Sequence, residues 1–142
     1  MELLNKQMTG KKEREIKVVQ FGEGNFLRGF VDYMIDIANE KTDFNGDIVL
    51  IKPINFGNLD LFHNQDCQYN VSLSGIVDGE AKVLRRTVTS VADAVDCYKD
   101  YEKYNNLAKL PSLQFVVSNT TEAGIVYEES DTFETAGFVV FL

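Results

Sequence analysis

The sequence contains no tryptophan, two prolines, two cysteines and one histidine. Cys67 and Cys97 stand apart without a CxxC pair, which is typical of reduced thiols in a cytosolic protein and not of a disulfide framework. His63 is the single histidine, so neither a histidine-based metal site nor a Ser-His-Asp triad is expected, and His63 reads as a polar loop residue. These scarcities predict a cytoplasmic protein without a metal centre.

Basic residues are in the minority and long apolar runs are missing. Fourteen Lys and Arg against 22 Asp and Glu give a net charge of -8, which repels phosphate backbones and anionic lipid. The longest apolar runs, 48–51 and 138–142, are far shorter than the roughly 20 residues that cross a bilayer. Residues 1–15 carry charges of both signs without a signal-peptide core and suggest a frayed polar leader. We expect neither a nucleic-acid nor a membrane partner.

A hydrophobic fraction of 44% is sufficient for one core of ordinary domain size. A β-branched run at 16–21 stops at Gly22, and from Asn25 to about Glu40 apolar residues recur at helical spacing. A second strand follows at 47–51 and ends at Lys52-Pro53, so the segment forms a βαβ unit. The residues expected on one face of its amphipathic helix are Phe26, Phe30, Tyr33, Met34, Ile37 and Ala38.

The rest of the chain departs from a simple βαβ repeat. After a polar loop at 56–68, alternating residues at 69–77 and 81–88 around Asp78-Gly79 predict an antiparallel hairpin. Ser90 and Asp93 resemble a capping box and predict a helix from Ser90 toward Leu110. A buried strand is expected at 113–118. The predicted class is α/β, with a Rossmann-type, mostly parallel sheet flanked by helices, an inserted hairpin and an incomplete set of strands.

The segment FGEGNFLRGF at 21–30 places two glycines between a predicted strand and a predicted helix. Gly22 suits the strained turn after a strand, and Gly24 lets the backbone approach a pyrophosphate that rests on the N–H groups of the helix start. Leu27 stands where the GxGxxG pattern has its third glycine, and Gly29 follows inside the helix. A glycine costs roughly 1 kcal/mol there, which a close approach of another element would explain. The segment favours a dinucleotide site, with a structural turn as the alternative.

Three further places have two readings each. Arg28 either reaches a phosphate or pairs with Glu23 or Asp32. Lys52 stands where an acidic residue usually binds the adenosine ribose, so it either attracts a 2′-phosphate, which leaves NAD or NADP open, or is a solvated strand end. Residues 119–122 offer amide, hydroxyl and carboxylate groups to a nicotinamide ribose or carboxamide, and are equally good turn and capping residues.

Three stretches together, VVQFGEGNFLRGF at 18–30, residues 65–75 and SNTTEAGI at 118–125, resemble the amino-terminal part of the mannitol dehydrogenase family of long-chain polyol and uronate dehydrogenases. The resemblance covers roughly residues 16–128. It implies an NAD-dependent oxidoreductase acting on CH–OH groups, with the interconversion of altronate and tagaturonate in hexuronate catabolism as the reaction. Reduction of fructuronate and oxidation of mannitol are alternatives within the family. An S-adenosylmethionine site and a non-catalytic nucleotide-binding or structural module are alternatives outside it.

The resemblance also implies a division of the chain and a set of cofactor contacts. Residues 1–15 would be the leader, 16–128 a partial NAD-binding domain and 129–142 an atypical, truncated end. The catalytic lysine, asparagine and histidine of the family come later in its chains, so no catalytic residue is expected here, and a uronate or polyol substrate would bind only with the missing helical domain. The expected NAD contacts are Val18, Val19, Gln20, Phe21, Gly22, Glu23, Gly24, Asn25, Phe26, Leu27, Arg28, Gly29, Thr121 and Glu122.

Overall fold

A four-stranded parallel sheet forms the centre of the computed structural model, which describes residues 3–120 and 129–130. Its strands are β1 (Glu15–Phe21), β2 (Gly46–Lys52), β5 (Val91–Asp96) and β6 (Phe115–Ser118), arranged in the order β5-β2-β1-β6. Numbered along the chain, these parallel strands have the order 3-2-1-4, which begins the doubly wound Rossmann sheet. The predicted fold class is confirmed.

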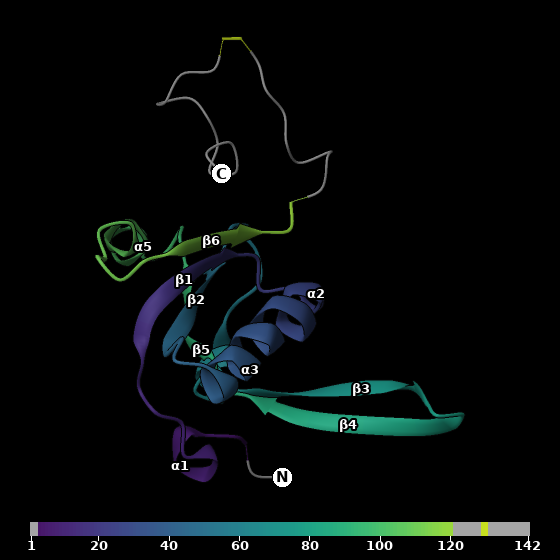
Figure 1. Cartoon of the computed structure of the whole chain (residues 1–142). Helices are drawn as coiled ribbons and strands as arrows, with labels where there is room; N and C mark the ends of the chain where they lie inside the picture. Colours follow the sequence, from purple (N-terminus) through teal and green to yellow (C-terminus); the bar gives the residue numbers. More distant parts are fainter. Residues whose placement is uncertain (1–2, 121–128, 131–142) are drawn as a thin grey trace.

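Apolar side chains fill both faces of this sheet, which explains why its strands read as continuous hydrophobic runs. On one face, Ile48 and Leu50 of β2 are completely buried and pack with Val18 of β1. On the other face, Ile51 packs with Val95 of β5 and the sheet is covered by α5 (Tyr101–Leu107). Figure 1 shows α5 on one side of the sheet and the helix that follows the glycine loop on the other.

That helix runs without a break through α2 (Asn25–Leu27), the π-helical turn η1 (Arg28–Asp32) and α3 (Tyr33–Lys41). Its extent agrees with the prediction, but much of the expected apolar face points outward. Phe26, Phe30 and Met34 are more than half exposed, whereas Asp32 and Asp36 are buried. The buried carboxylates have partners from the hairpin and the segment after it, and these polar contacts decide which side of the helix packs inward.

The predicted hairpin is present as β3 (Tyr69–Val77) and β4 (Glu80–Val88). Asp78 and Gly79 have positive φ values of 55° and 79°, as a two-residue hairpin turn requires. The hairpin projects from the body of the molecule (Figure 1), and most of its side chains are exposed, more than the half-exposed strand that the alternation predicts. At its base, Arg86 pairs with Asp36 of α3.

The expected helix over 90–110 is wrong in its first part, because Val91–Asp96 is strand β5 and the helix begins only at Tyr101. Val91 and Val95 pair with the fully buried strand β2, and burial in the sheet outweighs their helical spacing. The capping-box residues have other partners. The Ser90 hydroxyl donates to the carbonyl of Asp32 at 2.8 Å, and the Asp93 carboxylate accepts from the Ala94 N–H.

Two smaller expectations are corrected and one is confirmed. The loop at 56–68 contains a helical turn, α4 (Asp60–His63), and the His63 ring lies 2.9 Å from the carbonyl of Ala94. Strand β6 lies at the edge of the described sheet, so Phe115 and Val116 are about half exposed and not buried. Both cysteines are free thiols, as predicted, and both are fully buried.

The leader is ordered where the structure describes it. After α1 (Lys6–Thr9), Lys11 and Arg14 reach the buried carboxylate of Asp47, at 3.3 Å and 2.9 Å. This contact with the start of β2 replaces the expected frayed segment. Among residues 3–120 and 129–130, no helix has the length and apolar character that a membrane crossing requires.

Candidate functional site

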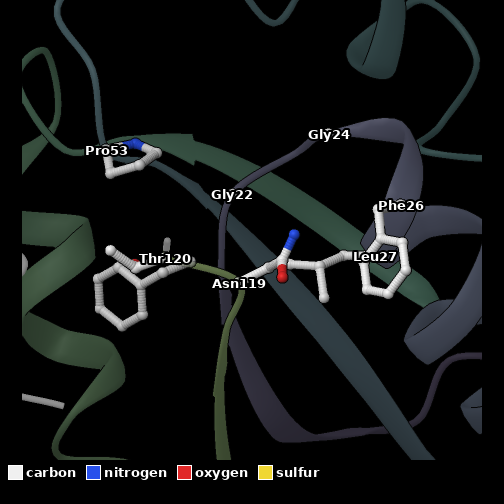
Figure 2. A pocket seen from close by; sticks show the side chains of 8 residues that line it. Gly22, Gly24, Phe26, Leu27, Pro53, Asn119 and Thr120 are labelled. Atoms are coloured by element: carbon white, nitrogen blue, oxygen red, sulfur yellow. The ribbon is translucent and has the colours of Figure 1, made fainter. Parts of the chain in front are cut away.

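A cavity of about 220 Å³ lies at the carboxyl ends of the central strands. Figure 2 shows the side chains that line it. It joins the glycine loop, the end of β2 and the turn after β6, three segments that are distant in the sequence. The lining residues are Phe21, Gly22, Gly24, Phe26, Leu27, Pro53, Asn119 and Thr120. Ligands of open α/β sheets bind at this edge. The volume is below the roughly 300–1,000 Å³ of a complete ligand pocket, so the cavity suits part of an extended ligand.

Gly22 makes the sharp turn from β1 into this cavity. Its φ of 104° is one that side chains with a Cβ rarely adopt. Its N–H donates to the carbonyl of Ile51 at 2.9 Å, and its own carbonyl accepts from the Gln20 side-chain amide at 3.2 Å. The fold itself therefore requires a glycine at this position, and hydrogen bonds to β2 and to the Gln20 side chain fix its backbone.

Gly24 is different, because the fold gives no reason for a glycine there. Its backbone is ordinary extended chain, with φ −69° and ψ 161°. A Cβ built on it would have no heavy atom within 4 Å among the described residues. The bare backbone faces the cavity, immediately before the helix that begins at Asn25. First-turn N–H groups of a helix lack carbonyl partners and carry the positive end of the helix dipole, so this is a place where an anion can approach closely.

Arg28 turns toward the base of the hairpin. Its guanidinium lies over the rings of Phe62 and Tyr69, 5.2 Å and 5.4 Å from their centroids, and donates to the side-chain oxygen of Asn25. The alternative reading of an ion pair with Glu23 or Asp32 is wrong, since neither pair forms in the described part of the chain. A phosphate contact by Arg28 stays a prediction.

Both roles expected for Lys52, a solvated strand end and a cation for a 2′-phosphate, are wrong. The side chain is only 2% exposed, and its Nζ lies 2.9 Å from a carboxylate oxygen of Asp96 at the end of β5. It is neither a solvated strand end nor a free cation available to a 2′-phosphate. The hydrogen bond from Lys52 holds the pKa of the Asp96 carboxyl below its usual value. Sequence reasoning missed Asp96 because it placed this residue inside a helix and not at a strand end.

Gly29 lies in the π-helical turn, and the close approach expected to explain it is not found. No heavy atom among the described residues lies within 4 Å of the position that a Cβ would take there. The same turn contains Asp32, a fully buried carboxyl that sequence reasoning did not place in the site. Burial raises the pKa of Asp32 to about 6, although a hydrogen bond from the Tyr69 hydroxyl opposes the shift.

The other expected cofactor contacts fall into three groups. Val18, Val19 and Gln20 are buried in β1, beneath the loop. Phe21 and Leu27 line the cavity, while Glu23 and Asn25 lie beside it on the loop and the helix start. Thr121 and Glu122 lie outside the described residues, so their proximity to the nicotinamide stays a prediction. Asn119 and Thr120, just before them, do line the cavity.

Comparisons with known proteins agree with this geometry. Residues 16–137 match the family model described as the mannitol dehydrogenase Rossmann domain. An altronate oxidoreductase from Bacillus subtilis is 45% identical over 118 residues, which are 83% of this chain and 25% of that protein. One from Phocaeicola vulgatus is 40% identical over 136 residues, which are 96% of this chain and 28% of that protein. The chain thus spans little more than a quarter of the length of these curated relatives.

Two solved structures share the fold. A substrate-free D-sorbitol dehydrogenase superposes with a TM-score of 0.67 at 21% identity, covering 90% of this chain and 29% of that one. A mannitol 2-dehydrogenase from Pseudomonas fluorescens, solved as a ternary complex with NAD and D-mannitol, has a TM-score of 0.66 at 18% identity, covering 87% and 27%. The family model matches most of the length of this chain. The chain therefore belongs to the mannitol dehydrogenase family and corresponds to its Rossmann domain.

Proposed function

We propose that the chain is the dinucleotide-binding part of an NAD-dependent altronate oxidoreductase, which interconverts altronate and tagaturonate by hydride transfer. The observation that carries this proposal is Gly24, whose missing side chain leaves open space between the cavity and the start of a long helix. The names of the curated relatives and the NAD complex of a structural neighbour support it. The implied group, NAD, accepts a hydride from a carbinol carbon or returns it to a carbonyl.

The residues present fit this cofactor. The backbone at Gly24 and the first N–H groups of α2 would hold the pyrophosphate, since both are accessible and Gly24 adds no side chain. Asn119 and Thr120, at the end of β6, would contact the nicotinamide half together with Thr121 and Glu122. The Lys52–Asp96 pair supports NAD over NADP, because the one lysine at the end of β2 is already neutralised.

The chemistry of the complete enzyme needs more than this domain. Hydride transfer to a carbonyl requires a positioned proton donor, and no residue lining the cavity is assigned that role. We infer that the donor and the sugar-acid pocket belong to the part of the relatives that this chain does not span. The choice of altronate over mannitol or fructuronate belongs to that part as well. The cytoplasmic location stays a prediction.

The test is a titration of the purified chain with NADH by calorimetry, with circular dichroism on the same sample. Gly24→Val fills the open space at the loop. Gly75→Val is its matched control, because Gly75 also has open space where a Cβ would be added but lies on the hairpin. We expect saturable NADH binding by the chain and by Gly75→Val, and at least a tenfold loss, about 1.4 kcal/mol, for a folded Gly24→Val.

Two results would contradict the proposal. A folded chain that is indifferent to NADH would reduce the glycine loop to a structural turn, and tight binding of S-adenosylmethionine in its place would indicate a different class of enzyme. Equal affinity of Gly24→Val and the parent chain would show that NADH binds elsewhere. NADPH serves as the comparison for Lys52, and we expect it to bind more weakly than NADH.

A further inference from the structure

A buried polar cluster lies at the junction of the glycine loop, the π-helical turn and the hairpin. It consists of Gln20 on β1, Asp32 at the end of η1 and Tyr69 at the start of β3, and is called the Asp32 cluster below. Gln20 and Asp32 are completely buried. The Tyr69 hydroxyl donates to an oxygen of the Asp32 carboxyl at 2.6 Å. Polar groups are costly to bury at such a place, so their presence calls for a reason beyond packing.

The cluster is connected to both sides of the glycine loop. On the strand side, the Gln20 amide donates to the carbonyl of Gly22 at 3.2 Å, on the residue that makes the sharp turn. On the helix side, Asp32 closes the π-helical turn that begins at Arg28, and the Tyr69 hydroxyl lies 3.4 Å from the Arg28 carbonyl. Single π-turns within α-helices occur frequently at functional sites.

Two oxygens of the cluster lack a hydrogen-bond donor in the described part of the chain. Among the described residues, Oε1 of Gln20 and Oδ1 of Asp32 are buried and have no hydrogen-bond partner. Two buried acceptors without a donor are unfavourable, by about 1–3 kcal/mol for each unsatisfied group. Burial raises the pKa of the Asp32 carboxyl and the neighbouring Gln20 side chain partly opposes this shift, so the two side chains interact.

We propose that Asp32 is a positioning residue for the dinucleotide: it orders Gln20, and through it the Gly22 carbonyl, while Tyr69 fixes the π-helical turn. Loop and helix start are then held in the one arrangement that presents the N–H groups after Gly24 to a pyrophosphate. The inference rests on the proposed NAD binding. Asp32 itself is completely buried and does not line the cavity.

The neighbouring carboxylate shows that burial alone does not give this role. Asp36 lies about one helical turn further along, is 4% exposed, and accepts hydrogen bonds from Arg86 at 2.6 Å and from the N–H of Thr89 at 2.7 Å. Both of its oxygens are thus satisfied by the base of the hairpin and the segment that follows it. None of these contacts reaches Gly22 or Gln20, which makes Asp36 the matched control.

The experiment measures NADH affinity by calorimetry and thermal stability by circular dichroism for the chain and four variants. Asp32→Ala removes the contacts of this side chain with Tyr69 and Gln20, and we expect NADH to bind at least tenfold more weakly. Asp32→Asn keeps the shape of the side chain and an acceptor for the Tyr69 hydroxyl, so affinity should return to within about threefold of the parent chain. Asp36→Ala should lose stability while its NADH affinity stays within the same threefold.

Tyr69→Phe is the fourth variant and removes only one hydroxyl, so it reports on affinity even where Asp32→Ala fails to fold. We expect its NADH affinity to fall by more than threefold. Unchanged affinity in both Asp32→Ala and Tyr69→Phe would overturn the inference, and so would equal losses in Asp36→Ala, which would indicate a general effect of stability. A parent chain that is folded but does not bind NADH would instead refute the proposed function, and the inference with it.

Discussion

Replacing Asp32 by asparagine should change how the stability of the protein depends on pH. Burial raises the pKa of Asp32 from 3.8 to about 6, against the opposing effects of the Tyr69 hydroxyl, the Gln20 amide and the Arg28 charge. A raised pKa means that the folded state favours the protonated acid. The stabilisation is complete below the unfolded-state pKa of 3.8 and is lost as the pH rises through about 6.

The size of the effect follows from the shift. A difference of about 2 units at about 1.4 kcal/mol per unit gives about 3 kcal/mol of lost stability between about pH 4 and about pH 8. Asparagine has nearly the same shape and carries no proton to lose. Relative to the Asp32→Asn variant, the parent chain should therefore become less stable by about this amount as the pH rises.

Urea denaturation followed by circular dichroism provides the assay, at several pH values between about 4 and 8. The quantity of interest is the difference in unfolding free energy between the two proteins, because the titration of all other groups cancels to first order. We expect this difference to grow with pH, to change most steeply between about pH 4 and about pH 6, and to level off above that range. A difference that is constant over the whole range would refute the assignment of a strongly perturbed carboxyl to Asp32.

Two further substitutions test local contacts of the sheet, one at the start of β2 and one at the end of β1. Asp47→Ala should lower the unfolding free energy by about 3–5 kcal/mol in urea denaturation. The substitution leaves Lys11, which is 2% exposed, as a buried cation without its carboxylate partner. A loss below about 1 kcal/mol would show that this pair does not hold the leader. Gly22→Ala should cost about 1–3 kcal/mol by the same assay, since its φ of 104° is unfavourable for alanine, and a cost-free substitution would contradict the observed turn.

The parts of the fold that were predictable from the sequence depend on local signals. The β-branched runs of β1 and β2 are buried on both sides, and their apolar character is continuous. The Asp78-Gly79 pair identifies the hairpin because few other dipeptides accept two positive φ values in succession. The glycine loop was predictable for the same reason, since Gly22 takes a conformation that other residues avoid.

What sequence reasoning missed depends on partners that are distant in the chain. Val91 and Val95 have the spacing of a helix, and only the proximity of β2 makes them a strand. Lys52 looks solvated until Asp96 is placed beside it by the parallel pairing of β2 and β5. The inward turn of Asp32 likewise requires Tyr69 from the hairpin. A one-dimensional pattern does not contain these pairings, so charge and exposure near the site were the features assigned wrongly.

The hairpin formed by β3 and β4 is a two-stranded sheet of its own, separate from the parallel sheet that carries the site. Its connection to α3 is made at the base, where Arg86 pairs with Asp36 and Glu40. Residues beyond that base can therefore be added or removed in cross-strand pairs without shifting the register of β1, β2, β5 or β6. The tip at Asp78-Gly79 is accordingly a position where length can vary during evolution, or a label can be inserted, while the glycine loop keeps its geometry.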